Sequence, residues 1–419
     1  MVVGLAMLAA CASEPLVALG PQAPADSLQA QVALQEALAG ERAVPGNRVT
    51  VLRDGAETFP AMFAAMQAAR DHINLEYYVF DDVHWGGQGL GDLLTARLAA
   101  GVAVDVIYDA YGSLHTDPAF LDRLRRAGAR LVEFGPLDPL TAGAPHNPND
   151  RDHRKIMVVD GRVGFAGGVN LDRVYENPRI AGDGGDDPAS AYWRDTDARI
   201  EGPAVAVLQR LFLQTWAQAH GPALPARDWF PGLPAQGDQT VRVLGSRPSD
   251  DRPLYFLARL SAEHAARESI SLSTGYFVPS HQEREELARA ARRGVRVRLI
   301  LPGHSDSEDS LATGRADYED LLEAGVDIYE LRNAVLHAKV AVIDGVWTTI
   351  GSSNLDHRSA VFNNEVDAIV LGRETGRTVE ALLDRDAGRS DHVTLQAWRQ
   401  RPFEERRREF FGRLFEWWL

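Results

Sequence analysis

Cysteine and long apolar runs are scarce in this 419-residue sequence. Its single cysteine, Cys11, excludes a disulfide within the chain, so stability must come from packing. After residue 11, no run of about 18 apolar residues suggests a transmembrane helix. The histidines show no H-E-x-x-H or Cys/His ligand spacing. Composition and spacing therefore predict neither a disulfide scaffold nor a metal centre.

Basic residues are also outnumbered: 59 Asp and Glu face 44 Lys and Arg, for a net charge of −15. Such a chain repels phosphate-bearing polymers at long range, which weighs against a general nucleic-acid binder. The hydrophobic share of 45% is ordinary for a folded protein, and the length exceeds what one core usually organises. We therefore expect two domains.

The apolar opening MVVGLAMLAAC ends in Leu8-Ala-Ala-Cys11, which resembles a bacterial lipobox. In such a signal the cysteine is acylated and becomes the mature amino terminus. The stretch before it lacks the usual Lys or Arg. Two interpretations stay open, a lipid anchor at Cys11 and a chance run of small residues.

An internal repeat dominates the rest of the chain. The segment DHRKIMVVDG around His153 recurs as LHAKVAVIDG around His337, 184 positions later. The same offset carries GGVNLD (167–172) onto GSSNLD (351–356). An earlier piece, 127–134, matches 324–331 at an offset of 197, and a longer first-half loop accounts for the difference. The chain is thus a duplicated unit.

Each copy has the same predicted order of elements: strand, helix, strand, helix and then shorter strands. These are expected at 73–80, 88–99, 102–108 and 116–127, and again at 270–277, 282–293, 295–301 and 315–324. Alternation of β-branched runs with amphipathic helical segments predicts two tandem α/β sandwich domains. We place the N-terminal signal-like segment and linker at 1–44, the domains at 45–220 and 241–419, and a Pro- and Gly-rich linker at 221–240.

The repeated motif has the form H-x-K-x-x-x-x-D. Side chains two apart on a strand share a face, so His153 and Lys155 should project together, as should His337 and Lys339. A phosphodiester repels nucleophiles by its own charge, and two lysines can neutralise it without a metal. A neutral imidazole can then attack phosphorus while a second one handles protons.

This doubled motif, followed in both copies by a Gly and an Asn, resembles the phospholipase D superfamily, and within it bacterial cardiolipin synthases. The segments WRDT (193–196), YFVP (276–279) and NNE (363–365) support the resemblance, which spans about residues 45–419. It implies two phospholipase D-like domains related by a pseudo-two-fold axis, and one active site without metal or other cofactor. The usual family assignment makes His153 the nucleophile and His337 the general acid/base, although the near-symmetry of the chain leaves the order open.

Further site residues follow from the repeat. Asn170 and Asn354 are expected to hold phosphoryl oxygens with the two lysines. Asp195 and Glu365 occupy matching positions, and each is a candidate acceptor that fixes a histidine tautomer. The motif residues Asp160 and Asp344 precede a Gly at a strand end, and two roles stay open for them, in catalysis and in holding the turn.

The predicted activity is phosphatidyl transfer at a bacterial membrane, with phosphatidylglycerol and phosphatidylethanolamine as candidate lipids and no nucleic acid as partner. The basic and aromatic C-terminal tail, 406–419, suits either a bilayer interface or the protein core. Three alternatives remain: a phospholipase D that uses water as acceptor, a nuclease of the superfamily, and a non-catalytic lipid-binding relative. The acidic charge weighs against the nuclease, and the intact His and Lys in both copies weigh against the last.

Overall fold

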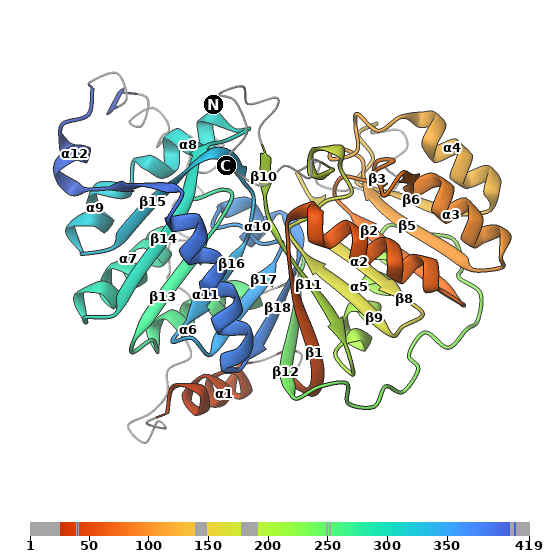
Figure 1. Cartoon of the computed structure of the whole chain (residues 1–419), viewed down its shortest axis with the longest axis horizontal. Coiled ribbons are helices and arrows are strands. Elements are labelled where there is room, and N and C mark those ends of the chain that lie inside the picture. The colour runs from red at the N-terminus through yellow and green to blue at the C-terminus, as the bar shows by residue number, and fades with distance from the viewer. Residues whose placement is uncertain are drawn as a thin grey trace, which may run out of the picture.

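The computed structural model describes residues 26–38, 40, 42–138, 149–176, 192–248, 250, 253–402 and 406–407. Two similar α/β halves lie side by side, the first on the right of Figure 1 and the second on the left. The described part of the chain contains no helix both long and apolar enough to cross a bilayer. Cys11 and residues 408–419 lie outside the described residues, so the lipobox and most of the C-terminal tail do as well.

The first half builds a mixed sheet from strands that pair in the order β6–β5–β2–β8–β9–β11–β1. Their bounds are β1 (Val44–Arg53), β2 (His72–Tyr77), β5 (Ala103–Asp109), β6 (Arg130–Phe134), β8 (Lys155–Val159), β9 (Val163–Gly167) and β11 (Thr196–Glu201). Helices α2 (Asp54–Ala68), α3 (Leu90–Ala99) and α4 (Pro118–Ala127) pack on one another, and α5 (Val205–Gln218) packs on β2, β8 and β9.

The second half repeats this order as β15–β14–β13–β16–β17–β18–β12. These strands are β12 (Gln239–Ser246), β13 (Ser269–Ser273), β14 (Arg296–His304), β15 (Asp327–Leu336), β16 (Val340–Ile343), β17 (Trp347–Gly351) and β18 (Asn363–Leu371). Its helices are α6 (Leu254–His264), α7 (His281–Arg292), α8 (Glu308–Arg315), α9 (Tyr318–Glu323) and α11 (Arg373–Ala387). The predicted α/β repeat is confirmed, whereas the single helix expected at 315–324 is wrong, because a break at 316–317 separates α8 from α9.

Smaller elements complete the fold. They are α1 (Ser27–Ala37), β3 (His84–Trp85), β4 (Gln88–Gly89), β7 (Arg151–Asp152), the 3-10 turn η1 (Arg173–Tyr175), β10 (Tyr192–Arg194), α10 (His357–Val361), β19 (Ser390–Val393) and α12 (Leu395–Arg399).

One of the hydrophobic clusters is built from residues of both halves. Residues of β8 alternate, so that Met157 joins the cluster under α2, α3 and α4 while Ile156 and Val158 join residues of the second half. Val342 of β16 and Val366 of β18 belong to this shared cluster and are fully buried. The halves therefore stabilise each other through this shared cluster, in addition to the apolar cluster that each half has of its own.

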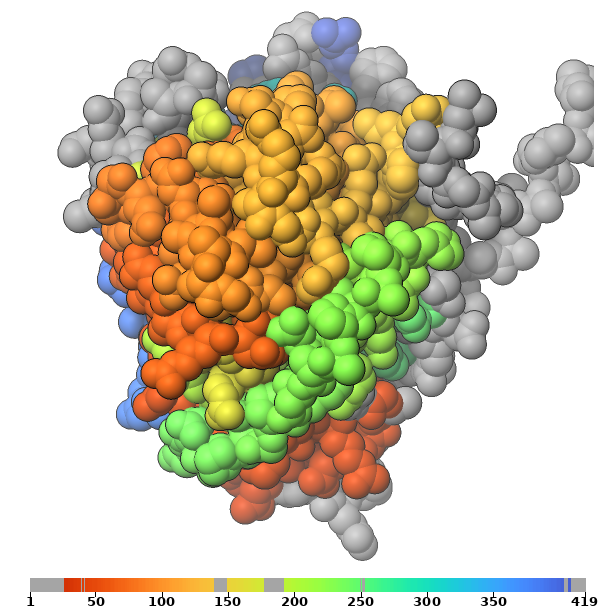
Figure 2. Space-filling view, turned by 90° about the vertical axis from the view of Figure 1, so that its right-hand side faces the viewer, coloured from red at the N-terminus to blue at the C-terminus, as the bar shows by residue number. Residues whose placement is uncertain are grey.

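The sheets are also joined through the backbone. Strand β1 pairs antiparallel with β11 of its own half and with β12 of the other. Between α5 and β12, residues 219–238 form no helix or strand and run across the outside of the first half (Figures 1 and 2). This segment includes most of the predicted linker, but the domain boundaries themselves stay a prediction.

Candidate active site

Each repeated histidine lies in a short loop that the other half holds in place. His153 follows β7, which pairs in parallel with β18, and its N–H donates to the Asn364 carbonyl at 3.0 Å. His337 follows β15, which pairs with β10, and its N–H donates to the Arg194 carbonyl at 2.8 Å. The prediction that both histidines lie on strands is wrong, because β8 begins at Lys155 and β16 begins at Val340. Backbone pairing between the halves fixes them instead.

Each histidine is paired with a carboxylate from the opposite half. His153 Nδ1 lies 2.9 and 3.0 Å from the two carboxylate oxygens of Glu365. His337 Nδ1 lies 2.7 Å from Asp195 Oδ2. An ionised carboxylate only accepts, so the Nδ1 that faces it carries the proton and the unprotonated Nε2 is left for chemistry. The pairs thus cross between the halves.

The two motif lysines are buried beside these rings. Lys155 Nζ donates to the His153 carbonyl at 2.7 Å, and Lys339 Nζ donates to the His337 carbonyl. The Tyr78 ring lies 5.3 Å from Lys155 Nζ and 5.1 Å from the His153 ring, so both side chains meet the same aromatic surface. Burial lowers the pKa of Lys155 to about 7 and that of Lys339 to about 8, against the pull of Glu365 and Asp195 respectively.

The charges of the two motifs act on one another. Burial lowers the pKa of His153 well below its usual value, and the positive charges of Lys155 and Lys339 lower it further. Burial and Lys339 likewise lower the pKa of His337, although Asp195 opposes them. Because the charges of Lys339 and His337 also lower the pKa of His153, the two motifs lie close enough to interact electrostatically. Burial thus disfavours the charged form of both rings, most strongly at His153, and this suits a nucleophile, which must be neutral.

The two carboxylates have different surroundings. Burial alone would raise the pKa of Asp195, but the nearby His337 and Lys339 and the hydroxyl of Tyr175, which donates at 2.8 Å, hold it below its usual value. The Tyr175 hydroxyl also lies 2.9 Å from His337 Nδ1. Glu365 lies among neutral donors instead, and burial raises its pKa to about 7 even though Lys155 opposes the shift.

The neutral donors at Glu365 include Ser352, Asn363 and Ser359. The Ser352 hydroxyl donates to one carboxylate oxygen, and the Asn363 amide donates to the other at 3.1 Å. The repeat aligns Ser352 with Gly168, which has no side chain, and it aligns Tyr175 with Ser359. The two catalytic pairs therefore differ at positions where the repeated sequence has diverged.

The two repeated asparagines are oriented in the same way in both halves. The Asn170 side-chain oxygen accepts from the Val79 N–H at 3.3 Å, and the Asn354 oxygen accepts from the Tyr276 N–H at 3.3 Å. Because each oxygen is held by backbone, the amide NH₂ is the group that remains to donate to a ligand.

Asp160 and Asp344 lie apart from the histidines, at the far ends of β8 and β16. The Asp160 carboxylate accepts from three backbone N–H groups, at residues 70–72, at 2.8–2.9 Å. Asp344 accepts in the same way from residues 267–269 at 2.8–3.1 Å. Both residues have positive φ, 52° and 51°, and each precedes a glycine in a tight hairpin. This geometry favours the turn-holding role over the catalytic one.

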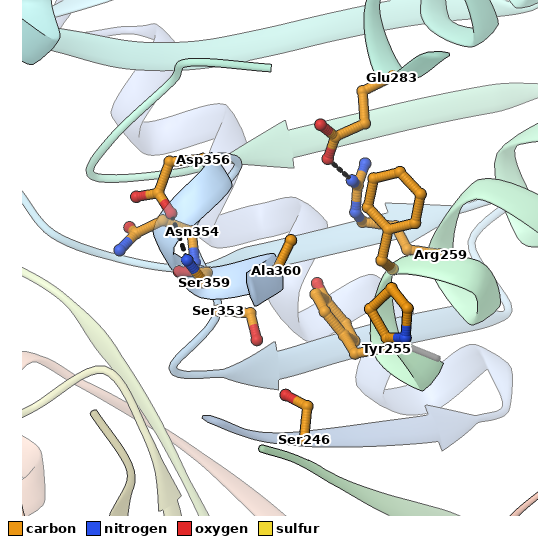
Figure 3. A pocket seen from close by; sticks show the side chains of 11 residues that line it. Ser246, Tyr255, Arg259, Glu283, Ser353, Asn354, Asp356, Ser359 and Ala360 are labelled. Atoms are coloured by element: carbon orange, nitrogen blue, oxygen red, sulfur yellow. Dashed lines mark hydrogen bonds and ion pairs between the residues drawn. The ribbon is translucent and has the colours of Figure 1, made fainter. Parts of the chain in front are cut away.

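A small cavity lies beside Asn354. Figure 3 shows Asn354, Asp356 and Ser359 on one side of it and the buried ion pair of Arg259 with Glu283 across from them. Its space of about 20 Å³ suits a single water molecule and no lipid. The described residues contain no cluster of His, Cys, Asp or Glu that could hold a metal ion.

Sequence reasoning missed Tyr175. The tyrosine lies in η1, just after the repeated cassette, and the second copy has no matching aromatic residue that would draw attention to it.

Known proteins resemble this chain in sequence and in fold. A family model described as "Cardiolipin synthase, PLD-like domain" matches residues 261–387. A probable cardiolipin synthase of Bacillus subtilis is 32% identical over 370 residues, and a cardiolipin synthase of Geobacillus thermodenitrificans is 36% identical over 380. Each alignment covers 88% of this chain and 72% of the relative.

A solved structure extends the comparison to the fold. The phosphatidylserine synthase of Haemophilus influenzae superposes with a TM-score of 0.69 at 12% identity, over 94% of this chain and all of that one. At that identity the likeness concerns the fold alone, whereas the sequence relatives identify the family. The chain belongs to the cardiolipin synthase family of phospholipase D-like proteins.

Proposed function

We propose that this protein transfers a phosphatidyl group from one phospholipid to the alcohol of another and so makes cardiolipin. The observation that carries the proposal is the pair of histidines whose Nδ1 atoms are both held by carboxylates of the opposite half. Their Nε2 atoms are then available for attack and proton transfer, and the family relatives are named for cardiolipin synthesis.

In the first step, Nε2 of His153 attacks phosphorus of the donor lipid. A phosphorus–nitrogen bond forms, the bond to the departing glycerol oxygen breaks, and that oxygen takes a proton from His337. This leaves a phosphohistidine on residue 153 and a neutral His337. Lys155, Lys339 and the amides of Asn170 and Asn354 neutralise and hold the phosphoryl oxygens.

In the second step, His337 removes the proton of the acceptor hydroxyl, whose oxygen attacks phosphorus and displaces His153. His337 must be protonated at the start of the first step, and it regains that proton here. Asp195 supports this cycle because its ionised form stabilises the imidazolium. The alternative acceptor is water, which would give phosphatidic acid by the same chemistry.

Substrates of this kind reside in bilayers, so the proposed site of action is a membrane surface of the bacterial envelope. The donor and acceptor lipids proposed are phosphatidylglycerol and, as an alternative partner, phosphatidylethanolamine. No metal or other cofactor enters the proposed reaction.

The test supplies purified protein with vesicles of phosphatidylglycerol, alone and mixed with phosphatidylethanolamine, in the presence of a chelator. Lipid products are separated by mass spectrometry. Cardiolipin as the main product supports transfer. If phosphatidic acid alone accumulates, the acceptor is water and the transferase proposal is wrong.

A further inference from the structure

A large groove lies beside the shared core, apart from the paired histidines. It has a volume of about 740 Å³ and is formed by α5, β12, the start of β1 and the loop that leads into α6. This volume falls in the range of sites that bind small molecules, about 300–1,000 Å³. The groove is therefore a candidate binding site.

One face of α5 forms a wall of this groove. Val207, Arg210, Leu211 and Gln214 line it, and each lies three or four residues from two of the others, which places them on one helix face. The face spans about 10 Å of helix at 1.5 Å per residue. Apolar and polar side chains thus alternate along one wall.

The rest of the lining has the same mixed character. Leu244 and Leu254 add aliphatic surface, while Arg42 and Arg247 add guanidinium groups. Asp250 is the one acidic residue among the described residues of the lining, and it is bound to Arg247 at 3.0 Å. With Arg154 and Arg210, the lining thus has four guanidinium groups and one carboxylate, in a chain whose net charge is −15.

Arg154 separates the groove from the catalytic pair. It follows His153 in the chain, but its guanidinium donates to the Glu365 carbonyl at 2.9 Å and to the Ser246 carbonyl at 3.0 Å. Its side chain is almost fully buried and is also paired with Glu76 at 3.6 Å. Arg154 and the Glu365 backbone therefore form a wall shared by two distinct spaces.

The side chains that line the groove indicate which kind of ligand it can bind. Arginine forks match phosphate and carboxylate groups, and leucine and valine side chains match an alkyl chain. None of the described lining residues is aromatic, so the groove offers no platform for a nucleotide base. The combination fits a molecule with an anionic head and an aliphatic tail.

We propose that this groove is an accessory binding site for an anionic amphiphile, a lipid with a phosphate or carboxylate head, distinct from the site of the paired histidines. The inference goes beyond the proposed reaction, since it holds whichever lipid the histidines process.

The test is titration calorimetry on the full chain with alkyl phosphates kept below their micelle-forming concentration. Decyl phosphate is expected to bind at least tenfold more tightly than hexyl phosphate, because each methylene that is buried adds up to about fourfold in affinity. Inorganic phosphate supplies the head group alone. If it binds as tightly as decyl phosphate, the amphiphile proposal is overturned.

Rim variants locate the site. The double variant Arg42→Gln with Arg210→Gln should weaken decyl phosphate at least tenfold. The matched control, Arg162→Gln with Arg296→Gln, removes the same charge from two exposed arginines elsewhere and should stay within about twofold. Equal affinities for the two double variants would refute the groove as the site.

A catalytic variant separates this inference from the proposed reaction. Binding of decyl phosphate should persist in His153→Ala, because His153 does not line the groove. Loss of binding in that variant would mean that the amphiphile occupies the histidine site, which would overturn the accessory site. Hydrogen exchange adds an independent readout, with protection expected in 205–218 and 239–247.

Discussion

The two histidine–carboxylate pairs come from one repeated sequence but have different electrostatic surroundings. Asp195 is held ionised by His337, Lys339 and the hydroxyl of Tyr175, whereas Glu365 is surrounded by neutral donors and has a pKa of about 7. An ionised partner favours a histidine that must carry positive charge, and a half-neutralised one favours a histidine that must stay neutral. The difference gives a physical reason to assign proton transfer to His337 and attack to His153.

The largest effect should come from removing either imidazole. Both His153→Ala and His337→Ala should lower lipid turnover by at least about 10⁴-fold, since each proton-transfer or nucleophilic role is worth that order. With bis(p-nitrophenyl) phosphate, whose leaving group needs no acid, His337→Ala should still give one burst of nitrophenolate. Mass spectrometry should then find the phosphoryl group on residue 153. A burst from His153→Ala instead would exchange the two roles.

The carboxylates should differ next. At pH 7, Asp195→Asn removes a full charge and should lower kcat about 10³–10⁴-fold, as for other histidines that lose an ionised partner. Glu365→Gln removes a carboxylate that is about half protonated, and should cost about tenfold. The difference between the kcat losses of the two variants should become smaller from pH 7 to pH 9 as Glu365 ionises. Equal losses at pH 7 would show that the two pairs are equivalent.

The lysines should set the alkaline limit of activity. With a pKa of about 7 for Lys155 and about 8 for Lys339, turnover should fall roughly 10–100-fold between pH 7 and pH 9 as both lose their charge. Stability should change in the opposite direction. The folded-state pKa lies below the ordinary 10.5, so the unfolded state binds more protons between about pH 7 and 10.5, and the free energy of unfolding rises across that window.

Thermal unfolding between pH 7 and 10 checks the second half of this prediction. The double variant Lys155→Met with Lys339→Met should lack both lysine contributions and therefore show a flatter curve. A wild-type curve that is no steeper than that of the double variant would contradict the buried, depressed lysines.

Tyr175 should have a smaller effect. Tyr175→Phe removes the hydroxyl that donates to Asp195, so the pKa of Asp195 should rise and kcat should fall about three- to tenfold. The acid limb of the pH–rate profile should move to higher pH. Ser359→Ala changes the aligned position of the second half and is the matched control, expected to leave the Asp195 limb unmoved.

The smallest effect on chemistry is expected at the motif aspartates. Asp160→Asn and Asp344→Asn should each destabilise the fold by about 1–3 kcal/mol, because an amide NH₂ then faces backbone N–H groups. Turnover per folded molecule should stay within about twofold. Denaturation and activity measured on the same samples separate the two, and a loss of kcat in fully folded protein would restore a catalytic role.

Much of the fold could be predicted from the repeat. Matching apolar runs such as 156–159 and 340–343 are buried strands, and the two copies pair their strands in the same order. The position of His153 before β8 could not be predicted, because pairing of β7 with β18 of the other half decides where the loop ends. The spacing of side chains within one segment cannot reveal that the segment pairs with a strand about 200 residues later in the chain.

The residues of the site could be predicted from the sequence, but the pairing of each histidine with its carboxylate could not. The repeat identified Asp195 and Glu365 as a matching pair, yet it could not reveal that each serves the histidine of the opposite half. Tyr175 has no counterpart in the second copy, so a search for repeats passes over it. The two histidine–carboxylate pairs differ at positions where the copies differ in sequence. A comparison of the copies identifies only the residues that they share.

The crossed pairs make catalysis a property of the assembled molecule. A half that has folded alone holds a histidine and a lysine but lacks the carboxylate that fixes the ring nitrogen. During synthesis the first half is complete well before Glu365 leaves the ribosome, so His153 gains its carboxylate partner only after most of the second half has been made. Docking of the two halves is thus the folding step that completes both histidine–carboxylate pairs at once.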